Sequence, residues 1–168
     1  MSIKKYKAVA FTGPSNSGKT TIIEKIAKVL VKDYKVVIVK NDPKDKASFD
    51  TKGKDSHKFF STGADTIVVS PTRTTYFSHQ SSEVEDMIKL AGDFDYLLVE
   101  GLKELPLPRI AIFREKIDID YYDYSNAIAT DDTIVTNDYD IPKSLDILDL
   151  NNTNMIISWI EENAKVLK

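Results

Sequence analysis

Hydrophobic residues along the chain fall into short continuous runs, separated by stretches in which they recur every three or four positions. The runs are typical of strands buried on both faces of a sheet, and the spaced positions are typical of one face of a helix. A weak alternation over residues 73–78 allows one further strand. The pattern predicts strands at residues 7–11, 36–39, 66–70, 96–99, 110–113, 127–129 and 145–150, and helices at residues 21–32, 56–62, 83–90 and from the candidate caps Asn151 or Asn152 onward to Leu167.

A glycine-rich segment joins the first predicted strand to the first predicted helix. Residues 13–20 fit the pattern G-x-x-x-x-G-K-[ST]. A strand, a glycine loop and a helix in this order form a phosphate-binding loop. The alternative is a glycine-punctuated turn that matches by chance, and the flanking strand and helix argue against it. The predicted nucleotide-binding residues of this loop are Gly13, Pro14, Ser15, Asn16, Ser17, Gly18, Lys19, Thr20 and Thr21.

The residue types in this loop suit a polyphosphate bound together with Mg²⁺. Glycine lets the backbone bend so that its N–H groups point at phosphate oxygens, and the start of the helix adds partial positive charge. Lys19 is expected to reach the β- and γ-phosphates, so we assign it to catalysis as well as to binding. The Thr20 hydroxyl is expected to ligate the metal ion.

The order of the elements defines the fold class. Strands that alternate with helices imply a mostly parallel, twisted sheet flanked by helices, an α/β fold of the three-layer P-loop NTPase type. Neither a repeat nor a linker is found, so we expect a single P-loop nucleotide-binding domain over residues 1–168. Residues 40–55 are dense in Lys and Asp and are expected to form a long loop that is either functional or mobile.

Charge and composition exclude several classes of protein. A net charge of −3 leaves no basic surplus to neutralise a nucleic-acid backbone, so we expect no nucleic-acid partner. The absence of cysteine excludes disulfides, thiolate metal sites and thiol catalysis. No apolar run is long enough for the core of a signal peptide or for a membrane span. We therefore expect a cytoplasmic protein that does not associate with membranes.

Acidic residues at strand ends are further candidates, because ligands bind at the carboxyl ends of parallel strands. Glu100 follows an apolar run and is predicted to hold Mg²⁺, more readily through a water than directly, or to orient the attacking water. Gly101 would let its amide approach the γ-phosphate. Asp42, or Asp45 in the same loop, is a second candidate metal ligand. The alternative for each acid is a solvated carboxylate with no ligand.

The base-binding residues are less well defined by the sequence. Guanine-reading loops use an aspartate that accepts the N1 and N2 hydrogens of the base, and two segments offer one: residues 130–132, with Asp131, and residues 136–138. Neither segment carries the lysine that usually lies along the base, so the residues alone do not decide between GTP and ATP. His57 and His79 are expected to be surface or loop residues rather than metal ligands.

Several segments taken together share their order and spacing with one protein family. They are residues 13–21, 53–56, 63–65, 99–103, 105–110 and 113–114. Over about residues 8–132 the chain resembles the GTP-binding adapter of molybdopterin-guanine dinucleotide biosynthesis, the MobB family. The Gly-Lys-Asp-Ser and Val-Glu-Gly-x-Lys segments discriminate this family better than the phosphate loop does.

The resemblance implies a homodimeric GTP-binding protein with weak GTPase activity. It would assist a partner molybdopterin guanylyltransferase, which joins GMP to molybdopterin. It would map residues 13–21 to the phosphate site, Glu100 to the acidic strand end and Asp131 to the neighbourhood of the base. The family usually carries histidines in the loop after the second strand, where this chain has none in residues 40–45. The role of those histidines is left open.

A small-molecule kinase with the same phosphate loop is the main alternative. Such kinases clamp phosphates with several arginines, and this chain has only Arg73, Arg109 and Arg114. A third class of function is a nucleotide-dependent metal-delivery protein or a partition-type ATPase. Metal-delivery proteins tend to carry His or Cys clusters, and partition-type ATPases carry an additional lysine where this chain has Pro14, so the sequence argues against both. Since neither an arginine finger nor a catalytic glutamine is evident, we expect slow hydrolysis, on the order of 10⁻⁴ to 10⁻² per second.

Overall fold

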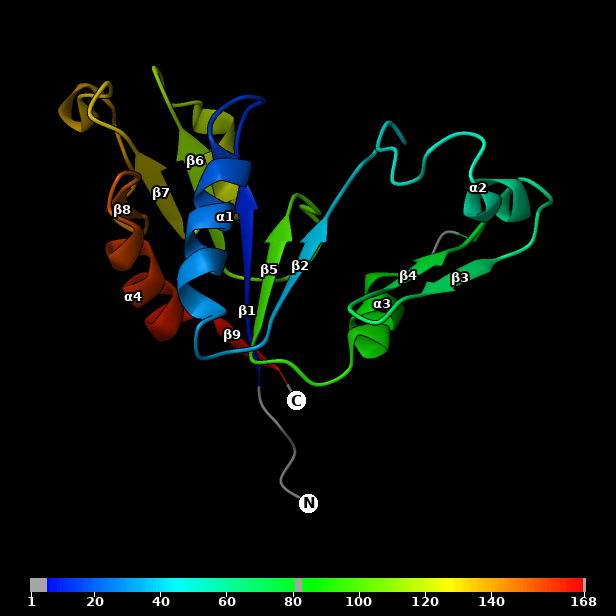
Figure 1. Ribbon diagram of the computed structural model, residues 1–168. Helices are drawn as coiled ribbons and strands as arrows, with labels where there is room; N and C mark the ends of the chain where they lie inside the picture. Colours follow the sequence, from blue (N-terminus) through cyan, green and yellow to red (C-terminus); the bar gives the residue numbers. More distant parts are fainter. Residues whose placement is uncertain (1–5, 81–82, 168) are drawn as a thin grey trace. The chain divides into compact units, whose positions relative to one another are not determined.

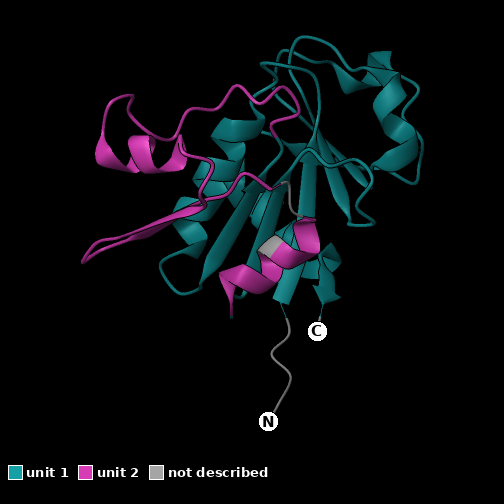
Figure 2. Ribbon diagram, turned by 90° about the vertical axis from the view of Figure 1, so that its right-hand side faces the viewer, with its two compact units in different colours: residues 1–41, 93–168 teal, residues 42–92 magenta. Residues whose placement is uncertain are grey.

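The computed structural model describes residues 6–80 and 83–167 and forms two compact units. The first unit comprises residues 1–41 and 93–168, and the second comprises residues 42–92 (Figure 2). The single domain predicted over residues 1–168 extends beyond the described residues at both ends, and the sequence pattern did not indicate the second unit. Within the described part of the chain, no helix has the length and apolar character needed to cross a membrane.

The first unit is built on a seven-stranded, mostly parallel sheet (Figure 1). Its strands are β1 (Tyr6–Thr12), β2 (Val36–Lys40), β5 (Tyr96–Glu100), β6 (Arg109–Phe113), β7 (Ala127–Thr130), β8 (Asp146–Asp149) and β9 (Lys165–Leu167). The strand order is β2-β5-β1-β6-β7-β8, and β9 pairs antiparallel with the first residues of β1. This order brings the carboxyl ends of β5 and β6 to the two sides of the end of β1.

Two helices cover one face of this sheet, and 3₁₀ helices and loops cover part of the other (Figure 1). The apolar faces of the two α-helices pack on buried strand residues such as Phe11, Leu98 and Ile112. On the other face, an aromatic and aliphatic cluster packs on β6 and β7. The helical elements are α1 (Lys19–Leu30), α4 (Thr153–Asn163), η1 (Ile119–Tyr124) and η2 (Thr136–Asp138). The predicted α/β fold, with a mostly parallel sheet flanked by helices, is confirmed.

The second unit contains a two-stranded antiparallel hairpin and two short helices. The elements are α2 (Asp55–Phe60), β3 (Thr66–Val69), β4 (Thr74–Phe77) and α3 (Val84–Ala91). The Asp65 carboxylate accepts hydrogen bonds from the His79 amide at 3.0 Å, the Tyr76 hydroxyl at 2.9 Å and the Ser78 hydroxyl at 3.1 Å. These bonds, led by the one from His79, lower the pKa of Asp65. They tie the base of the hairpin together.

The end of the chain departs from the predicted pattern. The closing helix was expected to reach Leu167, but it ends at Asn163 because Ala164 takes an extended backbone with ψ of 140°. Residues 165–167 then form β9. This strand pairs with residues 6–8 of β1, whereas β6 pairs with residues 10–12 of β1. At the other end of the helix, the predicted cap is confirmed: the Asn152 side chain accepts from the Met155 amide at 3.0 Å.

Candidate functional site

The phosphate loop runs from the end of β1 to the start of α1, at the carboxyl edge of the sheet (Figure 1). Gly13 has a φ of 135°, and a Cβ at this position would lie 2.4 Å from the carbonyl oxygen of Ile112, so only glycine fits. Gly18 precedes α1 with a φ of 97° and gives it no side-chain cap. The N–H groups of the first turn have no preceding turn to bond, which suits an anion. The exposed residues of the motif are Ser15, Asn16, Thr20 and Thr21.

Lys19 folds back over this loop. Its Nζ donates to the carbonyl oxygens of Gly13 at 2.9 Å and Pro14 at 2.6 Å. Burial lowers the pKa of Lys19, and the nearby Glu100 carboxylate opposes this shift. The buried hydroxyl of Ser17 has no hydrogen-bond partner among the described residues. The loop therefore holds an ammonium group and an unsatisfied hydroxyl, both of which phosphate oxygens can bind.

The predicted acidic strand end lies beside the phosphate loop. Because β5 is the direct neighbour of β1, the Thr20 hydroxyl reaches Glu100 and donates to its Oε2 at 3.3 Å. The other carboxylate oxygen accepts from Lys40 Nζ at 2.8 Å. Lys40 was not predicted as a site residue, and the register that places it opposite Glu100 brings it there. The structure thus joins two predicted metal-binding residues and adds a cation.

These residues fit a magnesium ion that is bound mainly by phosphates. Mg²⁺ prefers oxygen ligands and usually takes only one or two from the protein, and Thr20 and Glu100 supply two oxygens on one side of the loop. The Lys40 ammonium neutralises part of the carboxylate charge, which favours contact with the metal through water. Within residues 6–80 and 83–167 there is no group of three or more His, Cys, Asp or Glu residues that could hold a metal ion.

Two predicted residues are engaged in other contacts. Asp42 belongs to the second unit, and its Oδ2 accepts from the amides of Lys46 at 2.8 Å and Ala47 at 2.6 Å, which closes the turn of its own loop. The Gly101 amide donates to the carbonyl oxygen of Phe11 at 3.0 Å and so extends the pairing of β5 with β1. A contact between this amide and a γ-phosphate requires exchange of that bond.

Arg114, which was not predicted as a site residue, lies against the phosphate loop. A Cβ at Gly18 would stand 3.2 Å from the carbon of its guanidinium group, so the group packs on this glycine. The Arg114 Nε pairs with Asp131 Oδ2 at 3.5 Å, and Asp131 Oδ1 accepts from the Thr133 hydroxyl at 2.5 Å. Asp131, one of the two candidates for contact with the nucleotide base, is thereby linked through Arg114 to the phosphate loop. The other candidate segment, residues 136–138, forms η2.

A buried arginine holds the backbone that follows Glu100. Arg109 is 1% exposed, and burial lowers its pKa while Glu104 opposes the shift. Its guanidinium group donates to four backbone carbonyl oxygens, those of Gly101 at 2.9 Å, Leu102 at 3.0 Å, Lys103 at 3.3 Å and Leu105 at 3.2 Å. The arginine of the Leu-Pro-x-Pro-Arg segment therefore fixes the shape of the loop through backbone carbonyls.

The lysine of the Val-Glu-Gly-x-Lys segment anchors the same loop from outside. Lys103 Nζ lies 4.6 Å from the ring centre of Tyr121 and 4.7 Å from that of Tyr124, and it donates to the Tyr124 hydroxyl at 2.8 Å. This hydrogen bond raises the pKa of Lys103. The two cations, Lys103 and Arg109, therefore both hold the loop that follows Glu100.

The two histidines take part in local contacts of the second unit. The His79 ring stacks on Phe60 with 3.8 Å between ring centres, and its Nε2 lies 2.8 Å from the Phe60 carbonyl oxygen. His57 lies in α2, where its carbonyl oxygen accepts from the Ser61 hydroxyl at 2.6 Å. Both residues contribute to packing and turn formation.

Comparisons with known proteins point to one family. Residues 8–133 match the family described as Molybdopterin guanine dinucleotide synthesis protein B, MobB. The chain is 27% identical to the molybdopterin-guanine dinucleotide biosynthesis adapter protein of Haemophilus influenzae, over 91% of this chain and 86% of that protein. It is 29% identical to the probable adapter protein of the same biosynthesis from Bacillus subtilis, over 76% of each. The crystal structure of Bacillus subtilis MobB shares the fold, with a TM-score of 0.75 and 24% identity over 91% of this chain and 97% of that chain. The chain therefore belongs to the MobB family.

Proposed function

We propose that this protein is a GTP-binding adapter with weak GTPase activity that assists the attachment of GMP to molybdopterin. The family assignment supports a role in molybdopterin-guanine dinucleotide biosynthesis. The phosphate loop, with Lys19 folded into it and Thr20 beside Glu100, carries the nucleotide-binding part of the proposal. The proposal also includes Mg²⁺ as a cofactor, a homodimeric state, a cytoplasmic location and a guanylyltransferase as the partner protein.

Each residue of the site has a proposed role toward the nucleotide. The backbone N–H groups of residues 13 and 15–21 bind phosphate oxygens, since Pro14 has none to donate, and Lys19 exchanges its carbonyl acceptors for the β- and γ-phosphates. Thr20 and Glu100 hold the magnesium ion, which supplies positive charge to the phosphates when it is bound. Asp131 accepts hydrogen bonds from the base. Among these residues the Glu100 carboxylate is the group that can orient a water molecule for slow hydrolysis.

The alternative, a small-molecule kinase, clamps phosphates with several arginines, and two of the three arginines of this chain are held by groups of the protein itself. Arg109 is buried on backbone carbonyls, and Arg114 is paired with Asp131. Incubation with labelled nucleotide and candidate acceptors separates the two functions. Rapid phosphate transfer to an acceptor would replace the adapter proposal with the kinase.

A competition titration in the presence of Mg²⁺ tests the nucleotide preference. A fluorescent GTP analogue is bound to the protein and displaced with unlabelled GTP or ATP. We expect GTP to displace it at a lower concentration than ATP, and chelation of the metal to weaken both. The proposed function fails if neither nucleotide competes at millimolar concentration.

Substitution of Glu100 by glutamine should slow GTP hydrolysis about tenfold or more while changing GTP affinity by less than about threefold. Glutamine still accepts from the Thr20 hydroxyl, but it lacks the charge that orients water and supports the metal ion. Single-turnover phosphate release and calorimetry measure the two quantities. Lys40→Met, which removes only the partner ammonium, serves as the control. Equal losses of binding and hydrolysis in Glu100→Gln would make Glu100 a structural residue.

Replacement of Arg114 by alanine should weaken the binding of GTP and ATP alike, by about fivefold, or ~1 kcal/mol for a partly exposed charge. Its guanidinium group packs on Gly18 of the phosphate loop, and GTP and ATP carry the same phosphates to that loop. Asp131→Asn should instead reduce the preference for GTP and leave ATP affinity unchanged. Calorimetric titration of both variants with both nucleotides measures this. A nucleotide-selective loss in Arg114→Ala would contradict the assignment.

A further inference from the structure

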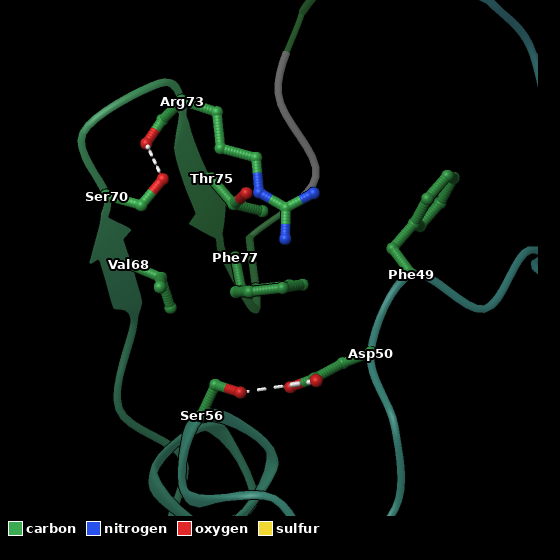
Figure 3. A pocket seen from close by; sticks show the side chains of 8 residues that line it. All are labelled: Phe49, Asp50, Ser56, Val68, Ser70, Arg73, Thr75 and Phe77. Atoms are coloured by element: carbon green, nitrogen blue, oxygen red, sulfur yellow. Dashed lines mark hydrogen bonds between the residues drawn. The ribbon is translucent and has the colours of Figure 1, made fainter.

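A pocket of about 180 Å³ in the second unit carries chemistry that the nucleotide site does not use (Figure 3). It lies between the β3–β4 hairpin, the start of α2 and the loop before α2. Its aromatic residues are Phe77 on the hairpin and Phe49, which is 82% exposed, on the loop. The Gly-Lys-Asp-Ser segment contributes Ser56 to the lining. A discriminating segment of the sequence thus ends in a pocket that phosphate binding does not explain.

An acidic group on one side of this pocket has an unused acceptor. Asp50 Oδ1 accepts from the Thr51 amide at 2.7 Å and from the Ser56 hydroxyl at 3.2 Å. Its Oδ2 is buried and has no hydrogen-bond partner among the described residues. Native structures leave few buried polar atoms without a partner, so this oxygen is available to accept a hydrogen bond from a ligand.

A basic group on the opposite side has unused donors. Arg73 extends its guanidinium group from the hairpin into the pocket (Figure 3) and forms no hydrogen bond or ion pair through it with any residue that the structure describes. The amide and the hydroxyl of Ser70 both donate to the Arg73 carbonyl at 2.9 Å, which fixes the backbone from which this side chain projects. The pocket therefore offers a guanidinium fork that no described residue engages, on a fixed hairpin turn.

We propose that this pocket binds a flat heterocycle that presents N–H groups to Asp50 and an acidic substituent to Arg73. A guanidinium group binds carboxylate or phosphate through paired hydrogen bonds, and Phe49 and Phe77 offer ring faces for stacking. The Asp50 carboxylate matches an amidine-type N–H edge, as in pterins. The volume is below the ~300–1,000 Å³ of sites that enclose a whole drug-sized ligand, so it accepts one ring system. The choice of a pterin rests on the proposed function, whereas the donor and acid chemistry rests on the pocket.

Pterin-6-carboxylate tests this site, because it is fluorescent and carries both groups. It is titrated into the full chain by fluorescence anisotropy, with the phosphate loop saturated by a non-hydrolysable GTP analogue. We expect saturable binding that Arg73→Ala weakens by about tenfold or more and Arg73→Lys weakens less. Lys58→Ala removes an exposed cation of the same unit outside the pocket and should change binding by less than about twofold. Unsubstituted pterin should bind more weakly, respond to Asp50→Asn and be insensitive to Arg73→Ala.

Three outcomes would overturn the inference. One is no saturable binding at millimolar probe, and another is an equal loss in Arg73→Ala and Lys58→Ala. The third is an Arg73→Ala variant that changes the sedimentation of the protein but not probe binding, which would assign the pocket to a second copy of the chain. GTP titrations of the same variants keep this test apart from the proposed function. If the wild type does not bind GTP, the proposed function fails, and the titration with pterin-6-carboxylate still decides whether the pocket binds a heterocycle.

Discussion

Replacement of Arg109 by methionine should lower the free energy of unfolding by about 3 kcal/mol, because a buried carbonyl oxygen left without a donor costs about 1–3 kcal/mol. The guanidinium group is buried and bonds four carbonyl oxygens. Two of these oxygens, on Leu102 and Leu105, keep backbone donors in the variant. Those of Gly101 and Lys103 have no other donor among the described residues, and water can reach only the exposed Lys103 readily.

Urea denaturation followed by the fluorescence of Trp159, the single tryptophan, measures this loss. Trp159 lies on α4, is 6% exposed and packs in the core cluster with residues of the sheet, so its signal reports unfolding of the sheet. Arg114→Met is the matched control, since the Arg114 side chain is 44% exposed and its replacement should change stability by no more than about 0.5 kcal/mol. Equal midpoints for the two variants would show that the carbonyl contacts of Arg109 do not hold the fold.

The parallel sheet could be predicted because its signals are local. The strands β5 and β6 are continuous apolar runs, since both faces of the sheet are covered along them. Residues 66–70 give the same signal, yet Ile67 and Val69 are 63% and 76% exposed and lie in a separate hairpin. A run of β-branched residues thus predicts that a strand forms but not which sheet it joins. That choice depends on long-range pairing, which one sequence does not display.

The candidate site follows the same division between local and long-range information. The phosphate loop lies in one segment, and the rule that ligands bind at strand ends was enough to select Glu100. The contacts of Lys40 with Glu100 and of Arg114 with Gly18 depend on strand order and register. The one available signal for Lys40 was its place at the end of the second apolar run. For Arg114 it was only its place after the run at residues 110–113.

Replacement of Lys19 by alanine should weaken GTP binding by about 1.5–3 kcal/mol, which is roughly 10- to 150-fold, the range for a hydrogen bond to a charged group. The ammonium group is already held over the loop by the carbonyls of Gly13 and Pro14. Phosphate oxygens replace these acceptors and carry full negative charge, so the exchange is favourable. It also offsets the burial that lowers the pKa of Lys19 in the free protein.

The size of this effect depends on position and not on the loss of one positive charge. Lys28→Ala makes the same change in charge on the exposed side of α1, where Lys28 pairs with Glu24. Long-range attraction to the nucleotide is largely screened at physiological ionic strength, so Lys28→Ala should alter affinity by less than about twofold. Calorimetric titration with GTP and Mg²⁺ at two salt concentrations compares the two variants. If both bind GTP as tightly as the wild type, the phosphates do not lie under Lys19, and the loop between Gly13 and Thr20 is not the nucleotide site.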